Sequence, residues 1–177
     1  MRILGIIIMA LLAFSCENRL ISAMNDDLDS LDQEMKIVEQ KITSVNPDTI
    51  EGFVDTIQFD MDYLELYLDG DTLERNTAIM IGSYSDLIRN LEKWDAAYKD
   101  HVREIEYAKN QLRSLREDVN NGLIPRELFD QAKPSESKAV KQLKETSENM
   151  VVWYDSNIER FDYLKSKVDS IMGKQVQ

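Results

Sequence analysis

Only a few side chains of this 177-residue sequence have the chemistry of a metal ligand or a proton carrier. His101 is the single histidine, and Glu104 follows it three residues later, which places both on one face of a helix. Helical di-iron proteins use two Glu-x-x-His units together with further glutamates, and the sequence contains no such unit. We therefore expect His101 to be solvated or to lie at the edge of a helical seam, and we predict no metal site.

Two short acidic groups, Asp60-Met61-Asp62 and Asp69-Gly70-Asp71, offer the carboxylates that calcium binds. Neither sets its carboxylates and glycine at the EF-hand spacing, so a solvated helix face or a turn explains them better. The sequence also contains no Gly-rich phosphate loop, no cluster of zinc ligands and no Ser/His/Asp set in a known motif. We predict neither enzymatic activity nor a cofactor, and no small-molecule substrate is evident.

The remaining reactive group is the thiol of Cys16, which is the only cysteine, so no disulfide can form within the chain. A basic end at Met1-Arg2 precedes it, followed by twelve uncharged residues from Ile3 to Phe14. As a helix such a run covers about 18 Å, whereas a bilayer core needs about 20 residues. A basic end, a short apolar run and a small residue before the cleavage point are typical of a secretory signal.

The segment Leu12-Ala13-Phe14-Ser15-Cys16 resembles a relaxed form of the lipobox of bacterial lipoproteins, in which a small residue precedes a cysteine. In that family the cysteine sulfur receives a diacylglycerol. The resemblance implies that residues 1–15 are a signal peptide and that Cys16 is the lipid attachment site of the mature chain. Ordinary cleavage after Ser15 is the alternative, and it would release an unanchored protein that also begins at Cys16.

The mature chain, residues 16–177, has the length of one domain. Loss of Arg2 from 21 basic residues leaves 20 against 33 acidic ones, a net charge near −13. Such a surface repels nucleic acid and anionic lipid headgroups, so the lipid anchor is the expected route to the membrane. We predict a short tether over residues 16–22 and a helical bundle domain over residues 23–177.

Apolar residues recur at alternating steps of three and four near the start of the mature chain, which is the pattern of a coiled-coil helix. The positions of this seam are Ile21, Met24, Leu28, Leu31, Met35, Val38, Ile42 and Val45. The acidic residues between Asp26 and Glu34 suit the positive end of a helix dipole. Asn46-Pro47 ends this helix and opens a second one, which should run to Leu68.

A third helix should begin after a turn at residues 69–71, with Asp71 or Thr72 as its cap, and should continue to about Val119. We expect a short turn at residues 126–131 and a fourth helix from about Ser135 onward. Short links favour antiparallel neighbours, so the predicted fold class is all-α: an antiparallel helical bundle of coiled-coil hairpins with about four helices, the third and fourth long. The unequal lengths predict two hairpins, the longer of which projects in part as an arm.

This arrangement of helices predicts which side chains of the third and fourth helices lie close together. If the third and fourth helices turn about residue 127, Trp94 lies near Phe161 and Trp153 lies near His101. Asn157 is in phase with the apolar seam of the fourth helix, and a position beside solvent explains it better than a buried one.

An apolar group lies at the expected tip of the long hairpin, where the least core is available to cover it. Its members, the candidate partner contact, are Leu123, Ile124, Leu128 and Phe129. An exposed apolar patch marks a docking surface. The alternative is that these side chains cap the end of their own bundle.

Two classes of function fit these features. The first is a non-catalytic component of the bacterial cell envelope, held by lipid at Cys16 on the periplasmic or surface face, with the outer membrane favoured. It would contact a protein partner, or a second copy of itself, along exposed helical seams. The second is a periplasmic binding module, similar to holdase chaperones, that holds a ligand or client between its helices.

Overall fold

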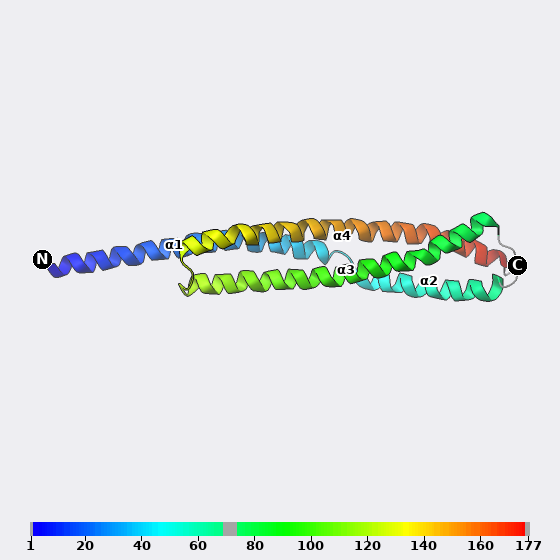
Figure 1. Cartoon of the computed structure of the whole chain (residues 1–177), viewed down its shortest axis with the longest axis horizontal. Helices are drawn as coiled ribbons and strands as arrows, with labels where there is room; N and C mark the ends of the chain where they lie inside the picture. The colour runs from blue at the N-terminus through cyan, green and yellow to red at the C-terminus, as the bar shows by residue number, and fades with distance from the viewer. Residues whose placement is uncertain (1, 69–73, 176–177) are drawn as a thin grey trace. The chain divides into compact units, whose positions relative to one another are not determined.

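The computed structural model describes the backbone of residues 2–68 and 74–175, and the side chains of residues 19–66, 68 and 74–173. It contains the helices α1 (Arg2–Ile42), α2 (Pro47–Leu68), α3 (Arg75–Asn120) and α4 (Arg126–Gln175) (Figure 1). No described residue lies in a β-strand, so the predicted all-α class is confirmed. The predicted turn at residues 69–71 and its cap, Asp71 or Thr72, lie outside the described residues.

The helices form two compact units, each of which contains three helical segments. Unit 1 comprises residues 1–40 and 103–146, and unit 2 comprises residues 41–102 and 147–177. In unit 1, α1 packs with the end of α3 and the beginning of α4, whereas α2 packs with the other parts of those helices in unit 2. Among the described residues, α1 and α2 belong to different units, contrary to the expected hairpin of the first two helices. Within each unit, the described parts of α3 and α4 pack with a third helix, contrary to the expected two-helix arm. Since α3 and α4 carry apolar stripes in both units, one shorter helix in each unit covers more of this apolar surface.

Asn46 and Pro47 define the start of α2. The side-chain Oδ1 of Asn46 accepts a hydrogen bond from the Asp48 N–H at 3.1 Å, and its carbonyl accepts one from the Thr49 N–H at 3.2 Å. These bonds satisfy amide groups that the first turn of a helix leaves open, and Pro47 has no amide to satisfy. The predicted bounds of this helix, Pro47 and Leu68, are confirmed.

The predicted short turn at residues 126–131 is wrong, because α4 begins at Arg126 rather than near Ser135. Pro134 therefore lies inside α4, where a proline removes one backbone hydrogen bond at a cost of about 3 kcal/mol. Phe129 in the first turn is fully buried, and burial of such a side chain contributes about 1.5–3 kcal/mol. The burial of Phe129 is thus large enough to offset much of the cost of the proline, and α4 runs through Pro134.

The turn between α3 and α4 is a Schellman motif, in which a glycine closes the helix. Gly122 has φ of 64°, a left-handed conformation that favours glycine. Its N–H donates to the Val119 carbonyl at 3.1 Å, and the Leu123 N–H donates to the Asp118 carbonyl at 2.8 Å. These bonds end α3 at Asn120, within one residue of the predicted end.

The contacts between α3 and α4 in unit 2 fix the register of the two helices. The Trp94 indole Nε1–H donates to the Met150 carbonyl at 3.0 Å. The His101 ring Nε2 lies 2.8 Å from Ser147 Oγ. These pairs centre between residues 122 and 124 rather than on residue 127, because residues 126–131 extend α4 instead of forming the turn.

This change of register overturns both predicted pairings. The Phe161 ring stacks on that of Phe53 of α2, with 3.8 Å between centroids, rather than near Trp94. Trp153 lies at the surface with 36% of its area exposed, rather than beside His101. A shift of a few residues in the turn rotates different side chains into contact, which is why the predicted pairs fail together.

The apolar seam predicted for the first helix is confirmed as core. Seven of its eight positions are buried, the last two of them in unit 2: Met24, Leu28, Leu31, Met35, Val38, Ile42 and Val45. Ile21 is half-buried. Alternating steps of three and four keep these side chains on one face, so α1 presents a continuous apolar stripe to the helices beside it.

The acidic residues of α1 do not lie at the positive end of a helix dipole, because the helix begins well before them. They pair instead with basic residues of the neighbouring helices in unit 1. Arg116 of α3 pairs with Asp29 at 2.8 Å and with Asp32 at 2.7 Å, and Lys144 of α4 pairs with Glu34 at 2.8 Å. Partly exposed pairs contribute about 1 kcal/mol or less each, so they select the packing partner more than they stabilise the fold.

Candidate functional site

The predicted lipid attachment site, Cys16, belongs to α1 and precedes Leu20 by four residues. Its side chain lies outside the described residues, and its modification stays a prediction. Leu20 lines a hollow of about 160 Å³ together with residues of the α3–α4 turn. The predicted anchor and this turn are therefore neighbours within unit 1. Among the described residues, no helix combines the length and apolar character needed to cross a bilayer.

The four residues predicted as a partner contact are not equivalent in the structure. Leu123 is exposed over 70% of its surface and Leu128 over 53%, whereas Phe129 is fully buried. Ile124 is half-buried and lines the same hollow as Leu20. The set therefore divides into two leucines that face outward and side chains that pack in their own unit.

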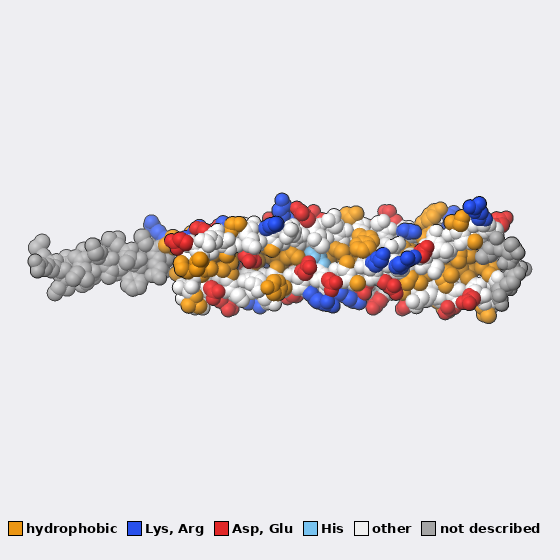
Figure 2. Space-filling view, viewed as in Figure 1, with side chains coloured by type: hydrophobic (Ala, Val, Ile, Leu, Met, Phe, Trp, Pro, Cys, Tyr) orange, Lys and Arg blue, Asp and Glu red, His pale blue; other side chains and the backbone are white. Residues whose placement is uncertain are grey.

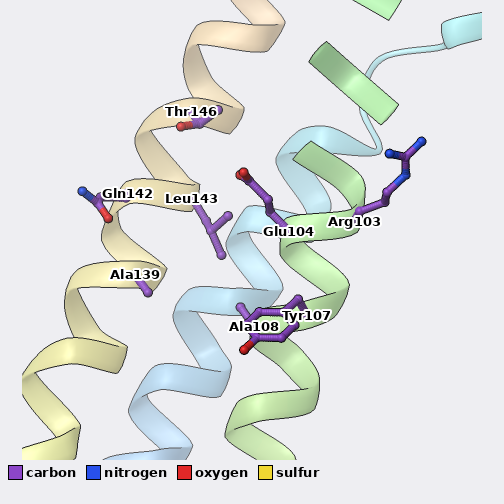
Figure 3. A pocket seen from close by; sticks show the side chains of 8 residues that line it. All are labelled: Arg103, Glu104, Tyr107, Ala108, Ala139, Gln142, Leu143 and Thr146. Carbon is purple, nitrogen blue, oxygen red and sulfur yellow. The ribbon is translucent and has the colours of Figure 1, made fainter. Parts of the chain in front are cut away.

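A groove of about 590 Å³ lies between α3 and α4 in unit 1 (Figure 3). Its lining residues are Arg103, Glu104, Tyr107 and Ala108 of α3, and Ala139, Gln142, Leu143 and Thr146 of α4. Ala108 and Ala139 have the smallest side chains of this set, and helices that face each other through alanine leave space that larger residues would fill. The groove was not predicted from the sequence, in which the two alanines are visible but their pairing is not.

The groove has an apolar floor and a polar rim. Ala108 and Leu143 are buried, and the exposed ring of Tyr107 stands beside them. Figure 3 shows Glu104 reaching toward α4 and Arg103 pointing away from it. In the part of the chain that the structure describes, no group of His, Cys, Asp and Glu side chains could hold a metal ion. The groove is thus suited to apolar contacts, with hydrogen bonding at its edge.

Polar residues at seam positions are buried, contrary to prediction. His101 is neither solvated nor at a seam edge but lies in the core of unit 2 beside the fully buried Ser147. Asn157 is also buried, with 5% of its surface exposed. A buried polar group needs a partner from another helix or a neighbour in the core, and such groups favour one register over others. Ser147 was detectable in the sequence as a polar residue between Leu143 and Met150.

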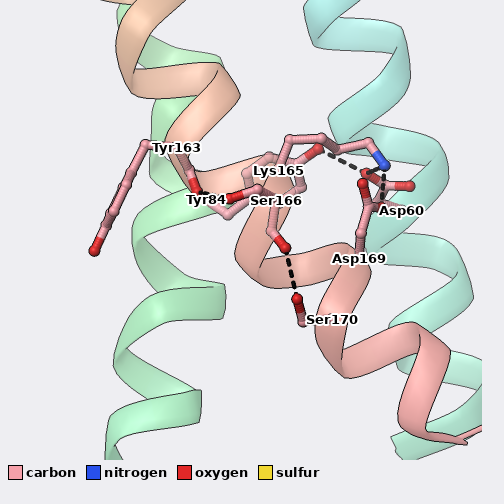
Figure 4. Close-up of polar contacts among 7 residues, drawn as sticks. All are labelled: Asp60, Tyr84, Tyr163, Lys165, Ser166, Asp169 and Ser170. Atoms are coloured by element: carbon pink, nitrogen blue, oxygen red, sulfur yellow. Dashed lines mark hydrogen bonds and ion pairs between the residues drawn. The ribbon is translucent and has the colours of Figure 1, made fainter.

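Asp60, predicted to lie on a solvated face, is buried among α2, α3 and α4 of unit 2 (Figure 4). It accepts a hydrogen bond from the Tyr84 hydroxyl at 2.6 Å, and Lys165 Nζ lies 3.4 Å from the same oxygen. Lys165 also pairs with Asp169. Asp62 is exposed. The Asp60 carboxylate is therefore engaged by helices of its own unit, which gives it a structural role.

In the same cluster, the pKa values of Tyr84 and Lys165 are both raised, so each side chain keeps its proton to a higher pH than usual. Burial raises the pKa of the Tyr84 phenol far above its ordinary value, and the hydrogen bond and charge of Asp60 and the charge of Asp169 raise it further. Burial lowers the pKa of the Lys165 ammonium, but its hydrogen bonds with Asp169 and Asp60 and their charges outweigh burial, so this pKa is also raised. Folded unit 2 therefore keeps the Tyr84 proton at a pH where an unfolded chain releases it.

The raised pKa of Tyr84 predicts that the protein loses stability at alkaline pH. Below pH 10.0, the ordinary tyrosine pKa, the contribution of Tyr84 is complete, and it declines at higher pH because the unfolded chain then binds fewer protons. We expect the free energy of unfolding to fall with pH more steeply in the wild type than in Tyr84→Phe, by up to about 1.4 kcal/mol per pH unit. Urea unfolding followed by circular dichroism measures both slopes. Tyr163→Phe, at an exposed position, should behave as the wild type; equal slopes for all three proteins would contradict the prediction.

Comparison of the chain with protein-family models, with curated proteins and with solved structures found no match. Two surfaces of unit 1 are the candidates: the exposed leucines at the α3–α4 turn, and the groove between α3 and α4.

Proposed function

We propose that this protein is a lipid-anchored component of the bacterial cell envelope that acts without catalysis, through contacts of its helical body with another protein. The single observation that carries the proposal is the position of Cys16, the only cysteine, between a twelve-residue apolar run and a helical body. A diacylglycerol on its sulfur supplies two acyl chains, and stable anchoring takes two such signals. The periplasmic or surface face of the outer membrane is the proposed location.

The placement of the reactive side chains supports a non-catalytic role. His101 and Ser147 are hydrogen-bonded to each other in the core, and Asp60 is engaged by Tyr84. A catalytic group must come within hydrogen-bond reach of its substrate, and these buried groups lack that access. The groove is open instead, and its walls are apolar or weakly reactive.

The groove is the surface that best fits a protein partner, and the occupant it suits is one amphipathic helix. Unit 1 has three helical segments, and a helix laid between α3 and α4 would complete a four-helix bundle. The face of the molecule shown in Figure 2 mixes acidic, basic and apolar side chains rather than presenting one sign of charge. Recognition of a partner would therefore depend on apolar contact in the groove, with Glu104 at its rim, more than on long-range electrostatic attraction.

Photocrosslinking in living cells tests this contact. A photoreactive phenylalanine analogue in place of Tyr107 should give one covalent adduct with a single partner, because this side chain stands at the groove. Ala139→Trp fills the groove and should abolish the adduct. The analogue at Ile37, an exposed position on α1 of the same unit, is the matched control and should give none. An adduct that survives Ala139→Trp would contradict the proposed partner surface.

The size of the groove also favours a second candidate, a binding module for an elongated apolar ligand or client segment. Small-molecule sites have volumes of about 300–1,000 Å³, and the groove, at about 590 Å³, lies within that range. Native mass spectrometry of the purified protein distinguishes this candidate. A bound mass that disappears in Ala139→Trp would favour ligand binding, whereas the bare protein mass in both would reject it.

A further inference from the structure

Three exposed leucines are found at the end of unit 1 where the α3–α4 turn meets α1. Leu123 is exposed over 70% of its surface, Leu128 over 53% and Leu20 over 48%. Leu20 and the turn residues Gly122 and Ile124 line the same hollow, so α1 and the turn are in contact there. Figure 1 shows the turn beside α1. The two elements thus present one exposed apolar end, which we call the leucine end and define by Leu20, Leu123 and Leu128.

The local structure does not require these leucines. In a Schellman motif the residue after the glycine usually makes an apolar contact with the residue five positions before it. Here that pair is Leu123 and Asp118, and a charged partner leaves Leu123 exposed. In the first turn of α4, Phe129 fills the core while its neighbour Leu128 faces outward. The apolar character of the leucine end therefore points to something outside the unit.

The charge of the chain is distributed unevenly between the two units. In the mature chain, which has lost Arg2, unit 1 contains 11 basic and 15 acidic residues, a net charge of −4, whereas unit 2 contains 9 basic and 18 acidic residues, a net charge of −9. Close to the leucine end, Lys133 pairs with Asp27 at 2.6 Å and Arg126 lies 3.9 Å from the same residue. Repulsion from lipid headgroups, inferred for the chain as a whole, is thus weak in the unit that carries the leucine end.

Chain length sets the distance between the leucine end and the proposed anchor. Cys16 precedes Leu20 by four residues, a rise of about 6 Å in a helix and at most about 14 Å in a fully extended chain. Apolar faces at a membrane interface enter the headgroup region by about 5–10 Å. A lipid on Cys16 would therefore bring the leucine end within reach of the bilayer surface.

We propose that the leucine end of unit 1 rests on the bilayer, with Leu123 and Leu128 inserted among the lipid headgroups. This proposal depends on the proposed lipid anchor at Cys16 and specifies how the anchored unit meets the membrane. The anchor supplies the affinity, and the leucines fix the end of unit 1 that faces the lipid. The groove between α3 and α4 then stays open to a protein partner, since its residues are distinct from the leucine end.

A single introduced thiol tests the proposal in the full-length protein. A lipid on Cys16 blocks the only native thiol, so Leu123→Cys would provide a unique site for a polarity-sensitive fluorophore. The matched control is Ile37→Cys, exposed over 44% and 17 residues beyond Leu20, which is about 25 Å along α1. Both proteins are purified from membranes and placed in phosphatidylcholine vesicles that carry a quencher on the lipid acyl chains.

We expect emission from position 123 to shift to shorter wavelength and to be largely quenched, and emission from position 37 to stay as in water. Leu128→Cys should repeat the result for position 123. Water-like emission at position 123, a blue shift there without lipid quenching, or equal quenching at both positions would each overturn the bilayer contact. The wild type should take no label. If Cys16 of the wild type accepts the fluorophore, the proposed lipid anchor is wrong. This outcome is distinguishable from the other three, which concern only the bilayer contact.

Discussion

Replacement of Trp94 by alanine is expected to lower the free energy of unfolding by about 3–5 kcal/mol, the usual cost of removing a large buried aromatic side chain. Trp94 has no exposed surface and lies against the rings of Tyr98 and Tyr154, with centroids 5.1 Å and 5.3 Å away. Its indole N–H also donates to the Met150 carbonyl. The variant loses packing on α3 and α4 together with one interhelical hydrogen bond. Urea unfolding followed by circular dichroism measures the change.

Trp153→Ala provides the matched control because it removes the same side chain from the surface of the same unit. Trp153 is exposed over 36% of its area, and we expect a loss of about 1 kcal/mol or less. Similar losses for the two variants would show that Trp94 is not the centre of the unit 2 core. They would also contradict the register that places Trp94 against Met150 rather than Phe161.

Replacement of Cys16 by alanine is expected to abolish the incorporation of labelled fatty acid. The only thiol that can receive a diacylglycerol is removed, and with it two acyl chains that contribute about 0.8 kcal/mol for each buried CH₂ group. Metabolic labelling with palmitate in intact cells measures the change. Ser15→Ala keeps a small residue before the cysteine and should label as the wild type does. Labelled Cys16→Ala protein would place the lipid elsewhere and contradict the proposed attachment.

The sequence was sufficient for features that depend on short stretches of chain. Both bounds of α2 follow from Asn46-Pro47 and from an apolar stripe that ends at Leu68. The seam of α1 follows from its alternating spacing, since side chains three and four residues apart share one face. These signals are local, and no knowledge of the neighbouring helices is needed to interpret them.

The sequence was misleading where contacts between distant residues decide the structure. Pro134 indicated a break, yet α4 continues through it, and Phe129 of its first turn is buried in the core. The same error displaced the turn and with it every predicted pairing of α3 with α4. Buried polar pairs such as Asp60 and Tyr84 could not be predicted either. The sequence shows which polar residues are in phase with a seam, but not which residue faces each of them.

The candidate site was partly visible in the sequence. The exposed leucines at positions 123 and 128 belong to the predicted apolar tip, but their proximity to Leu20 depends on how α1 packs against the turn. The groove required the correct register, since Ala108 and Ala139 line it together only when the turn centres near residue 123. Small residues on two separate helices do not reveal a groove until the pairing of those helices is known.

The intact mass of the protein purified from membranes tests the lipid anchor most directly. The expected mass is that of residues 16–177 with a diacylglyceryl group in place of the Cys16 thiol hydrogen, and the added mass should be located on the peptide that begins at Cys16. An unmodified thiol at Cys16 in the protein purified from membranes, or recovery of the protein from the soluble fraction alone, would contradict the proposed anchor and with it the contact between the leucine end and the bilayer.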